Sequence, residues 1–591
     1  MIYGKLDIEG WRTACVGGEA PESSFEDSNL RLFFFGILYN RDTLQATPAE
    51  SNARIAARVY ASDPVWGFSR LDGSFIVVYY SERECGVVRD HHGTHSSVYY
   101  TSDGVFSTSW HYLVEQSGRP FVCDRVALSS FLQRGILREG CSVASGVHSL
   151  AAGARVCMNA GEASACPYAA DNFPRPHINI DKHPDVEAYA RRYRELHADA
   201  IRRRIRESCK VGILLSGGYD SGSNLAALRS IYDGRIDSYS VGFKGDSWSE
   251  LPMARLMSDT FGTRHHEYEI DGSEIEFLPE IVRFLGEPFV EGGLMVNYCA
   301  MRMIGDDKPD VILGGDGSDQ YFGTSGREVA LHHLLARFRM LPAARLAHRL
   351  LGAESCCKGG KCSRVHFHLD KVLHVLDGDR FGFSDHALRA LLQHPEEDFL
   401  PEAASRSEDA GCFERLYADH ALRSDLSIVI DRVILYKASR MARMFGNRLE
   451  FPFVDLELYR FLQDVPVGLK CKGDGVWNIA RGRSESKYLL KHCYKPLLPE
   501  AITARKKQGG FAPMPLFFAD RGRRFRLQEF ILSSGIFDDY LDRAAVERFL
   551  SDYDREAERK DTWFWYRQNK ALQYFNLLTL AVWWEEFVEK K

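Results

Sequence analysis

The spacing of hydrophobic and polar positions changes partway along the chain. Before residue 170, apolar positions alternate with polar ones or gather in short β-branched and aromatic runs, most clearly at 30–40 and 73–90. Turn sequences such as LDGS, RDHHG and TSDG interrupt these runs. This pattern predicts a layered β-sheet domain with short hairpins in the first 170 residues.

From Val186 the spacing becomes helical, and short apolar segments alternate with helical ones. The strand candidates are VGILL, RIDSYSVGF, RHHEYEI and PDVILGG, at 211–215, 235–243, 264–270 and 309–315. Their alternation with helical segments predicts a parallel, doubly wound sheet that binds its ligand at the carboxyl ends of the strands. After Gly323 the pattern is mostly helical. The segment 169–185, rich in Pro, Asp and Asn, is the predicted linker.

Composition narrows the class of protein. The 591 residues exceed one ordinary core, while 45% hydrophobic and 26% charged residues are typical of a soluble globular protein. A net charge of −6 gives no general attraction to nucleic acid. We find neither an apolar run of the roughly 18 residues needed for a membrane span nor a secretion signal, so we expect a cytoplasmic protein.

The 14 cysteines are therefore expected to be thiols rather than a disulfide framework. Their one cluster, CCKGGKC at 356–362, supplies three thiols without a clear fourth ligand. We favour a solvated loop there over a zinc site.

A glycine-rich turn, SGGYDS at 216–221, stands between the first strand candidate of the second region and a helical segment. The glycines allow a close backbone approach, and the following helix start attracts an anion. Ser216 and Ser221 add hydroxyl donors. Asp220 would repel a phosphate unless Mg²⁺ lay between them. Because the turn lacks a Walker lysine and a G-x-G-x-x-G pattern, we favour a nucleotide-phosphate site of another kind over a plain capped turn.

A second acidic turn, GGDGSDQYFG at 314–323, also follows an apolar strand candidate. Its carboxylates, Asp316 and Asp319, have the chemistry of a metal site, a base or both. Taken alone, a hydrogen-bonded Asx turn explains the sequence equally well. The first loop, about one hundred residues earlier, favours the functional interpretation.

A basic loop near the C-terminus places Arg505, Lys506 and Lys507 before Gly509 and Gly510. Charge runs are usually solvated surface. Here the cations are also suited to a triphosphate, because Lys or Arg stabilises the negative charge that builds on departing pyrophosphate.

Together and in this order, these stretches resemble the asparagine synthetase family over nearly the whole chain. LLSGGYDS is similar to its pyrophosphate loop, and GGDGSDQYFG to its second motif. RLEFPFVDLELYRFLQDVP resembles its R-x-P-F-L-D segment, and SKYLLKHCYKPLLPEAITARKKQGGF its C-terminal element. The strand runs of the first 170 residues, with FLQRGIL, resemble its glutaminase domain.

The resemblance implies an α/β protein. Residues 1–170 would form a glutaminase-like β-sandwich of the N-terminal-nucleophile type, layered with helices. Residues 186–591 would form a doubly wound, parallel-sheet ATP pyrophosphatase domain with helical additions. The implied reaction begins when a substrate carboxylate attacks the α-phosphorus of ATP. An amine then attacks the acyl adenylate, which yields amide, AMP and pyrophosphate.

The resemblance also assigns roles to residues, with ATP and Mg²⁺ as the implied cofactors. Pyrophosphate and Mg²⁺ would be bound by Ser216, Gly217, Gly218, Asp220 and Ser221, with Asp319 as the second metal carboxylate. The adenosine pocket would be lined by Leu214, Val241 and Gly315. Lys507 would stabilise the departing pyrophosphate and the acyl transition state.

Ile2 departs from the family at the glutaminase. The family uses a cysteine directly after the initiator Met, whose freed α-amine activates its own thiol. Ile2 stands at that position, and Cys15 is too far along the chain to become N-terminal by ordinary Met removal. We therefore expect no glutamine hydrolysis and a first domain retained as a scaffold.

Further departures lie in the synthetase. Asp316 stands where asparagine synthetases place Glu and β-lactam synthetases place Tyr; it could act as a base or as a metal ligand. Tyr436 lies where the β-lactam enzymes put a supporting acid residue, and we weigh a catalytic role for it against that of a core aromatic. Arg448 and Glu450 are swapped relative to the family's Glu-x-Arg, which argues against aspartate as substrate.

The leading hypothesis is a lasso peptide cyclase, a macrolactam synthetase that joins a peptide's N-terminal amine to an Asp or Glu side chain. Its support is Ile2, Asp316 and the long helical insertion between Gly323 and Arg423, which can wall a large pocket. The alternatives are a β-lactam-synthetase-like ring former, an ammonia-dependent asparagine synthetase and a non-catalytic scaffold. A precursor peptide is the expected partner, with a leader peptidase and a leader-binding protein implied by the family.

Overall fold

The computed structural model divides the chain into two compact units. One contains Met1–Ser130, Leu137–Pro174 and Arg283–Pro288, and the other contains Phe131–Ile136, Arg175–Val282 and Phe289–Lys591. The structure describes residues 1–10, 14–116, 121–159, 161–168, 179, 181, 183–206, 210–245, 249–305, 308–324, 326–352, 361–378, 382–400, 411–505, 512–557, 559 and 562–590. The predicted linker, 169–185, and the cysteine cluster, 356–362, lie largely outside the described residues.

Two antiparallel sheets make up the first unit. One has the order β11-β10-β6-β5-β4-β3 and the other the order β2-β1-β8-β7-β9. The six strands of the first sheet are β3 (Ser23–Glu26), β4 (Leu30–Leu38), β5 (Gly73–Ser81), β6 (Cys85–Arg89), β10 (Ala154–Asn159) and β11 (Glu162–Pro167). The five strands of the second are β1 (Ile2–Lys5), β2 (Val16–Gly18), β7 (Tyr99–Thr101), β8 (Val105–Ser107) and β9 (Val147–Ser149).

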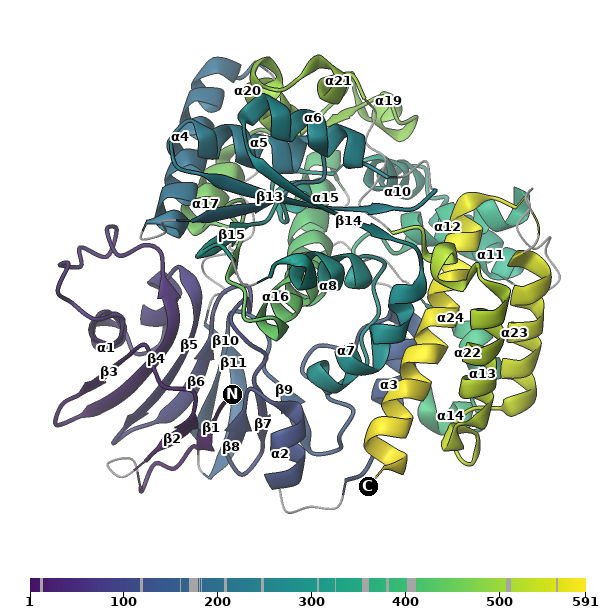
Figure 1. The fold of residues 1–591 in the computed structure, drawn as a ribbon, viewed down its shortest axis with the longest axis horizontal. Coiled ribbons are helices and arrows are strands. Elements are labelled where there is room, and N and C mark those ends of the chain that lie inside the picture. The colour runs from purple at the N-terminus through teal and green to yellow at the C-terminus, as the bar shows by residue number, and fades with distance from the viewer. Residues whose placement is uncertain are drawn as a thin grey trace. The chain divides into compact units, whose positions relative to one another are not determined.

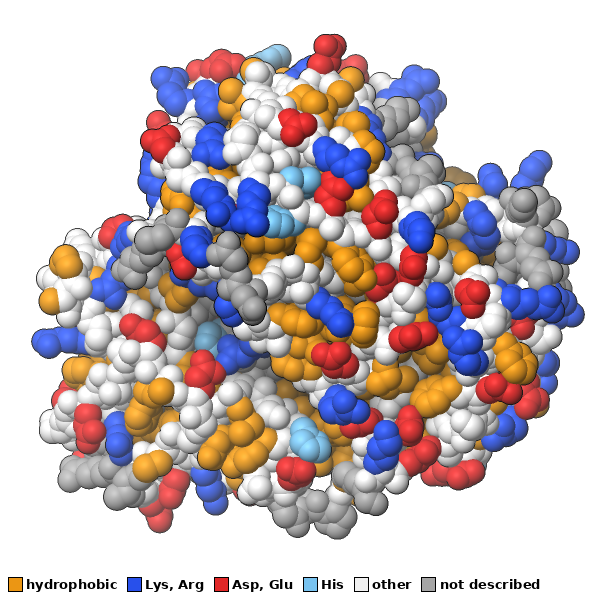
Figure 2. Space-filling view, viewed as in Figure 1, with side chains coloured by type: hydrophobic (Ala, Val, Ile, Leu, Met, Phe, Trp, Pro, Cys, Tyr) orange, Lys and Arg blue, Asp and Glu red, His pale blue; other side chains and the backbone are white. Residues whose placement is uncertain are grey.

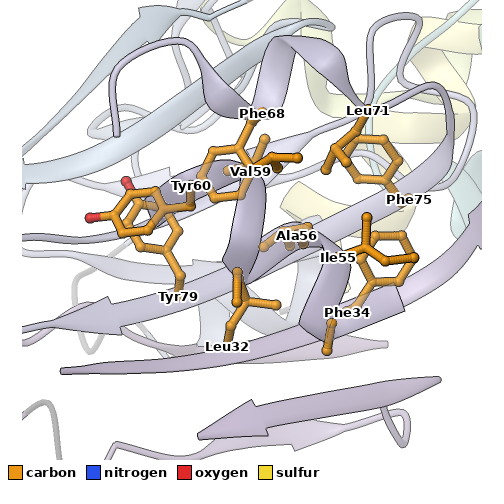
Figure 3. Packing of buried hydrophobic residues seen from close by; sticks show 14 of the residues in the cluster. Leu32, Phe34, Ile55, Ala56, Val59, Tyr60, Phe68, Leu71, Phe75 and Tyr79 are labelled. Carbon is orange, nitrogen blue, oxygen red and sulfur yellow. The ribbon is translucent and has the colours of Figure 1, made fainter. Parts of the chain in front are cut away.

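Side-chain alternation along β4 and β5 explains how this unit is layered. Leu32 and Phe34 pack into a cluster with Val59 and Tyr60 of helix α1 (Asn52–Ser62), as Figure 3 shows. Phe35, one residue further along, lies in a separate cluster that includes residues of both sheets. Each strand thus presents one face to the helix and the other to the second sheet, which is the period of two of a β-strand.

A five-stranded parallel sheet forms the centre of the second unit, in the order β14-β13-β12-β15-β16. Its strands are β12 (Val211–Leu214), β13 (Ile236–Phe243), β14 (Arg264–Ile270), β15 (Val311–Leu313) and β16 (Leu449–Glu450). Helices α6 (Leu251–Phe261) and α8 (Leu294–Met303) both contact β13 and β14, and they lie on opposite sides of these strands in Figure 1. The mixed α/β class is therefore confirmed, and the four expected parallel strands are joined by β16.

Helices dominate the rest of this unit, as the sequence pattern after Gly323 predicts. The region 327–444 contains α10 (Arg327–Arg337), α11 (Leu341–Gly352), α12 (Lys361–Leu373), α13 (Asp385–Leu391), α14 (Pro395–Asp398), α15 (Phe413–His420), the π-helical η3 (Ala421–Ile434) and α16 (Leu435–Met444). The long C-terminal helices are α22 (Arg521–Ser533), α23 (Arg543–Ala557) and α24 (Phe564–Trp584). Among the described residues, no helix has the length and apolar character to span a bilayer.

The visible surface carries charges of both signs. Figure 2 shows Lys and Arg side chains interspersed with Asp and Glu. That mixture agrees with the small net charge of −6.

Candidate active site at the carboxyl edge of the parallel sheet

The turn after β12 is built around a position that requires glycine. Gly217 has φ +76°, and a Cβ there would lie 2.6 Å from Cβ of Met253. Helix α5 (Tyr219–Arg229) begins directly after Gly218. The hydroxyl of Ser221 accepts a hydrogen bond from the Ser216 N–H at 3.1 Å, which closes the turn onto the helix start. The predicted sequence of strand, tight turn and helix is therefore present.

The second acidic turn lies against this first one because β15 pairs directly with β12. The chain runs outward from β12 to β13 and β14 on one side, and to β15 and β16 on the other, so the two turns meet where the strand order reverses. Ligands of open parallel sheets bind at such a point. A Cβ on Gly315 would lie 3.2 Å from the Ser221 backbone nitrogen, which measures how closely the turns approach.

Lys487 joins the carboxylates of the two turns. Its Nζ donates to Asp220 Oδ1 at 2.5 Å and lies 2.9 Å from Asp319 Oδ1. The hydroxyl of Ser318 donates to the same oxygen of Asp220 at 2.5 Å. Lys487 is only 2% exposed. Its ammonium therefore holds together two carboxylates that would repel each other without a cation.

Sequence reasoning did not single out Lys487 as a site residue. It lies 267 positions from Asp220, and the helix that follows it, Tyr488–Tyr494, contains neither glycine nor an acidic residue that would mark a site. Its backbone has φ +53°, a left-handed conformation that non-glycine residues seldom adopt. Strain of this kind gathers at functional sites when surrounding contacts compensate for it.

A buried histidine fixes the helix that carries Lys487. Lys487 is the N-cap of helix α20 (Tyr488–Tyr494), and the hydroxyl of Tyr494 in this helix lies 2.7 Å from His197 Nδ1. His197, on α4 (Val186–Ile205), is also 2.7 Å from Asn224 Oδ1 through Nε2. The amide of Asn224 in turn donates to the Gly314 carbonyl at 2.9 Å. This chain of hydrogen bonds links α4, α5, α20 and the second turn.

The protonation state of His197 follows from these contacts. Burial lowers the pKa of His197 to about 4, so its imidazole is neutral. Because the Asn224 amide nitrogen already donates to Gly314, its oxygen must accept, and Nε2 of His197 carries the proton. Nδ1 then accepts from the Tyr494 hydroxyl. Every polar atom of the imidazole ring is thereby satisfied.

Asp316 has the electrostatics of a group that exchanges protons. Burial raises the pKa of Asp316 to about 6; the charge of Lys437 opposes this rise, and the carboxylates of Glu291, Asp220 and Asp319 add to it. Lys437 and Glu291 form a buried ion pair with each other. A pKa near the working pH is what a general base requires.

Tyr436 lies one residue before Lys437. Its ring is 4.9 Å from that of Phe289, and the Arg440 guanidinium is 5.7 Å from its centre. These contacts are those of a half-buried packing residue. The catalytic role of Tyr436 stays a prediction, and Lys437 is the side chain of this helix that acts on the charge of Asp316.

The predicted adenosine-pocket residues come to one edge of the sheet. Leu214 ends β12, Val241 lies near the end of the adjacent β13, and Gly315 follows β15 on the other side. Leu214 and Val241 are half-buried. Lys506 and Lys507 lie outside the described residues. The preceding Arg505 lies 3.6 Å from Glu250.

The donor set fits Mg²⁺. This hard ion is bound by one or two carboxylates together with substrate phosphates and water. Asp220 and Asp319 supply such carboxylates and already share one cationic partner, Lys487. Within the described part of the chain, no three His, Cys, Asp or Glu side chains are grouped to hold a metal ion by themselves.

Two of the departures from the family have a structural counterpart. Ile2 is fully buried in the core between the two sheets of the first unit. Arg448 and Glu450 pair with each other, with Arg448 Nε 2.9 Å from Glu450 Oε1. Glu450, the last residue of β16, is buried, and Arg448, just before the strand, neutralises its charge.

Comparison with known proteins places this geometry in a family. The sequence profile described as asparagine synthase matches residues 192–585. The chain belongs to the asparagine synthase family. It is 22% identical to asparagine synthetase (glutamine-hydrolyzing) 1 of Bacillus subtilis strain 168 over 570 residues, which cover 91% of this chain and 85% of that protein. The expected resemblance is confirmed at the level of the family.

Other likenesses are partial. A Mycobacterium bovis protein that bears the name of a glutamine-hydrolyzing asparagine synthetase is 28% identical over 375 residues, 61% of this chain. The chain spans about half, 54%, of that relative's length. The structure of NMN synthetase from Francisella tularensis matches 24% of this chain and 58% of the synthetase chain, at 14% sequence identity. Its TM-score of 0.18 is too low to carry an argument.

Proposed function

We propose that this protein is an ATP-dependent ligase that forms an amide bond and releases AMP and pyrophosphate. The observation that carries this proposal is the cluster of Asp220, Asp319, Ser318 and Lys487 at the switch point of the parallel sheet. Two carboxylates and a buried ammonium, next to a glycine-rich turn and a helix start, match the chemistry of Mg²⁺ and a polyphosphate. Mg²⁺, when bound, would neutralise phosphate charge during the displacement.

The residues of this site have separate roles in the proposed reaction. Ser216, Ser221 and the amides at the start of α5 bind the pyrophosphate part of ATP, which is a substrate. Lys487 is placed to stabilise the charge that accumulates on pyrophosphate as it leaves. Asp316 accepts a proton from the attacking amine, because its carboxyl has a pKa of about 6 and is ionised at neutral pH.

For the substrate, we propose a peptide whose amine and carboxylate belong to one molecule, so that the product is a macrolactam. Ile2 is a buried hydrocarbon side chain and offers no nucleophile for glutamine hydrolysis. An amine must then come from the substrate or from free ammonia. The helical insertion from α10 to α15 can form the wall of a substrate pocket larger than one that binds a single amino acid. A precursor peptide, a leader peptidase and a leader-binding protein belong to this proposal.

Ammonia-dependent synthesis of asparagine is the second candidate. It is favoured by the two relatives described above, both of which bear the name of an asparagine synthetase. A β-lactam-type ring former is a third variant of the same chemistry. The Arg448–Glu450 pair is the feature that argues against aspartate, because the charges expected for the substrate pocket neutralise each other.

The experiment supplies the chain with ATP, Mg²⁺ and one of two substrate sets. One set is aspartate with ammonium, and the other is a library of peptides with a free N-terminal amine and an internal Asp or Glu. Mass spectrometry detects macrolactam formation as the loss of one water from a peptide. Asparagine formation without any such loss would replace our proposal with the second candidate. The Asp220→Ala variant controls for ATP-dependent turnover in both sets.

A further inference from the structure

Two cysteines face the same side of an edge hairpin in the first unit. In the pairing of β10 with β11, Arg155 lies opposite Cys166 and Cys157 lies opposite Ser164. Cys157 and Cys166 are therefore diagonal neighbours on one face of the sheet. The adjacent position Val156 points to the opposite face, into the core between the two sheets. The two thiols thus lie on the face that carries α1.

Polar side chains lie around Cys157 at the end of the apolar cluster under α1. The hydroxyl of Tyr79 lies 3.3 Å from Cys157 Sγ, and Cys157 is 3% exposed. Figure 3 shows the hydroxyls of Tyr60 and Tyr79 at the same end of this cluster. Both hydroxyls donate to Glu84 Oε1 at 3.1 Å. Gly86 makes room for the Tyr79 ring, since a Cβ there would lie 2.9 Å from the Tyr79 hydroxyl.

Arg155 brings a buried positive charge to this group of polar side chains. It is 8% exposed, and its Nη1 donates to the Pro64 carbonyl at 2.9 Å and to the Tyr79 hydroxyl at 3.3 Å. The same nitrogen lies 3.4 Å from Glu84, which balances part of the charge. The guanidinium therefore lies beside the thiols in a setting from which water is largely excluded.

Cys166 has two neighbours on this face, Arg155 directly opposite and Cys157 on the diagonal. It interacts with the Cys157 thiol and with the Arg155 guanidinium, and it is half-buried rather than enclosed. The hydrogen bond from Cys157, helped by Arg155, lowers the pKa of Cys166 to about 6. Cys157 is the protonated member of the pair, and its pKa is raised. A thiolate beside a guanidinium, reachable from solvent, is the usual setting of a reactive cysteine.

We propose that Cys157 and Cys166 form a redox-active dithiol, in which Cys166 is the nucleophile toward peroxides and Cys157 is the resolving thiol. This site is distinct from the ligase chemistry proposed above and does not depend on it. The Cys166 thiolate attacks one peroxide oxygen and breaks the O–O bond, which leaves a sulfenic acid and, after protonation, the first product water or alcohol. Cys157 then attacks the sulfenic sulfur, its proton leaves with the displaced hydroxide as water, and a disulfide forms. Two thiols are oxidised and one peroxide is reduced.

The first test oxidises the full chain with a slight excess of hydrogen peroxide, blocks the remaining thiols with N-ethylmaleimide, and maps the digest by mass spectrometry. The expected result is a peptide pair linked through Cys157 and Cys166 while Cys15, an exposed cysteine of the same unit, remains blocked by maleimide. In Cys157→Ser, we expect a sulfenic acid at Cys166 that a cyclic diketone traps. Oxidation of Cys15 before the pair, or no linkage between Cys157 and Cys166, would overturn the proposal.

The second test measures the rate of iodoacetamide alkylation of Cys166 against pH, by peptide mass spectrometry under native conditions. A thiolate that is half formed near pH 6 should react roughly tenfold faster there than an ordinary thiol, after allowing for its lower intrinsic nucleophilicity. Cys15 in the same sample is the matched control. The charged and titratable groups that act on Cys166 include Arg155, Cys157 and Glu84, and Tyr79 in turn contacts Cys157 and Glu84. Arg155→Lys retains the charge but loses the planar fork, and should move the midpoint of the Cys166 profile to higher pH. A Cys166 profile that coincides with that of Cys15 would contradict the proposed nucleophile.

Discussion

Replacing Asp316 by Asn separates the role of this residue in chemistry from its effect on stability. Burial raises the carboxyl pKa from 3.8 to about 6, so the folded protein holds the ionised form at a cost. At about 1.4 kcal/mol per pKa unit, that cost is roughly 3 kcal/mol at neutral pH. Asn has nearly the same shape without the charge. We therefore expect Asp316→Asn to raise the free energy of unfolding at pH 7 by about 2–3 kcal/mol while slowing amide formation.

The pH dependence of this gain follows from the direction of the pKa change. Well below pH 3.8 the Asp316 carboxyl is protonated in both folded and unfolded chains, so the wild type and the variant should be equally stable there. The stability due to the protonated form is lost as the pH rises through about 6. The advantage of the variant should therefore grow between pH 4 and 6 and stay constant above that.

Urea unfolding followed by tryptophan fluorescence at several pH values measures this difference. Asp319→Asn is the matched control, because Asp319 lies in the same turn but pairs with Lys487 at 2.9 Å. Its loss should lower stability, because it leaves the ammonium with one carboxylate partner fewer. If Asp316→Asn is less stable than the wild type at pH 7, or its effect does not change between pH 4 and 7, the assignment of a strained ionised carboxylate at Asp316 is wrong.

Three further substitutions test the rest of the site. Asp220→Ala should abolish turnover, because it removes a carboxylate from the Mg²⁺ and nucleotide site. ATP-binding calorimetry and product assays measure this loss, and near-normal turnover would contradict the assignment of the loop. Lys487→Met should slow pyrophosphate release and destabilise the fold, because Asp220 and Asp319 then repel each other; an unchanged rate in stopped-flow pyrophosphate assays would mean a structural role alone. Lys507→Ala should remove about 2–3 kcal/mol of transition-state stabilisation, which lowers kcat/KM through a lower kcat. A change confined to KM would instead indicate uniform binding.

The sequence predicts the fold correctly where neighbouring residues determine the backbone conformation. The strand from Val211, the tight turn at Gly217 and the helix that follows are specified by residues within about twenty positions, and all three are present. The two turns could be expected to meet because parallel strands end at one edge. Strand β16 was not expected, because two residues inside a proline-containing segment give no periodic signal.

Only part of the candidate active site could be predicted from the sequence. Lys487, Lys437 and Glu291 are ordinary charged residues in sequence, and only long-range packing brings them to the acidic turns. The same holds for His197, whose contacts with Asn224 and Tyr494 span 27 and 297 positions. Local patterns identify residues that shape a turn, whereas they do not identify a side chain that reaches the turn from a distant helix.

The central claim is that ATP is cleaved between its α- and β-phosphates to drive formation of an amide. The most direct test incubates the chain with ATP labelled at the α-phosphate, Mg²⁺, and both the peptide and the aspartate–ammonium substrate sets, and then separates the labelled products. Our account predicts labelled AMP, formed with an equal amount of pyrophosphate and dependent on Asp220. Labelled ADP as the product, or no nucleotide cleavage with either substrate set, would contradict it.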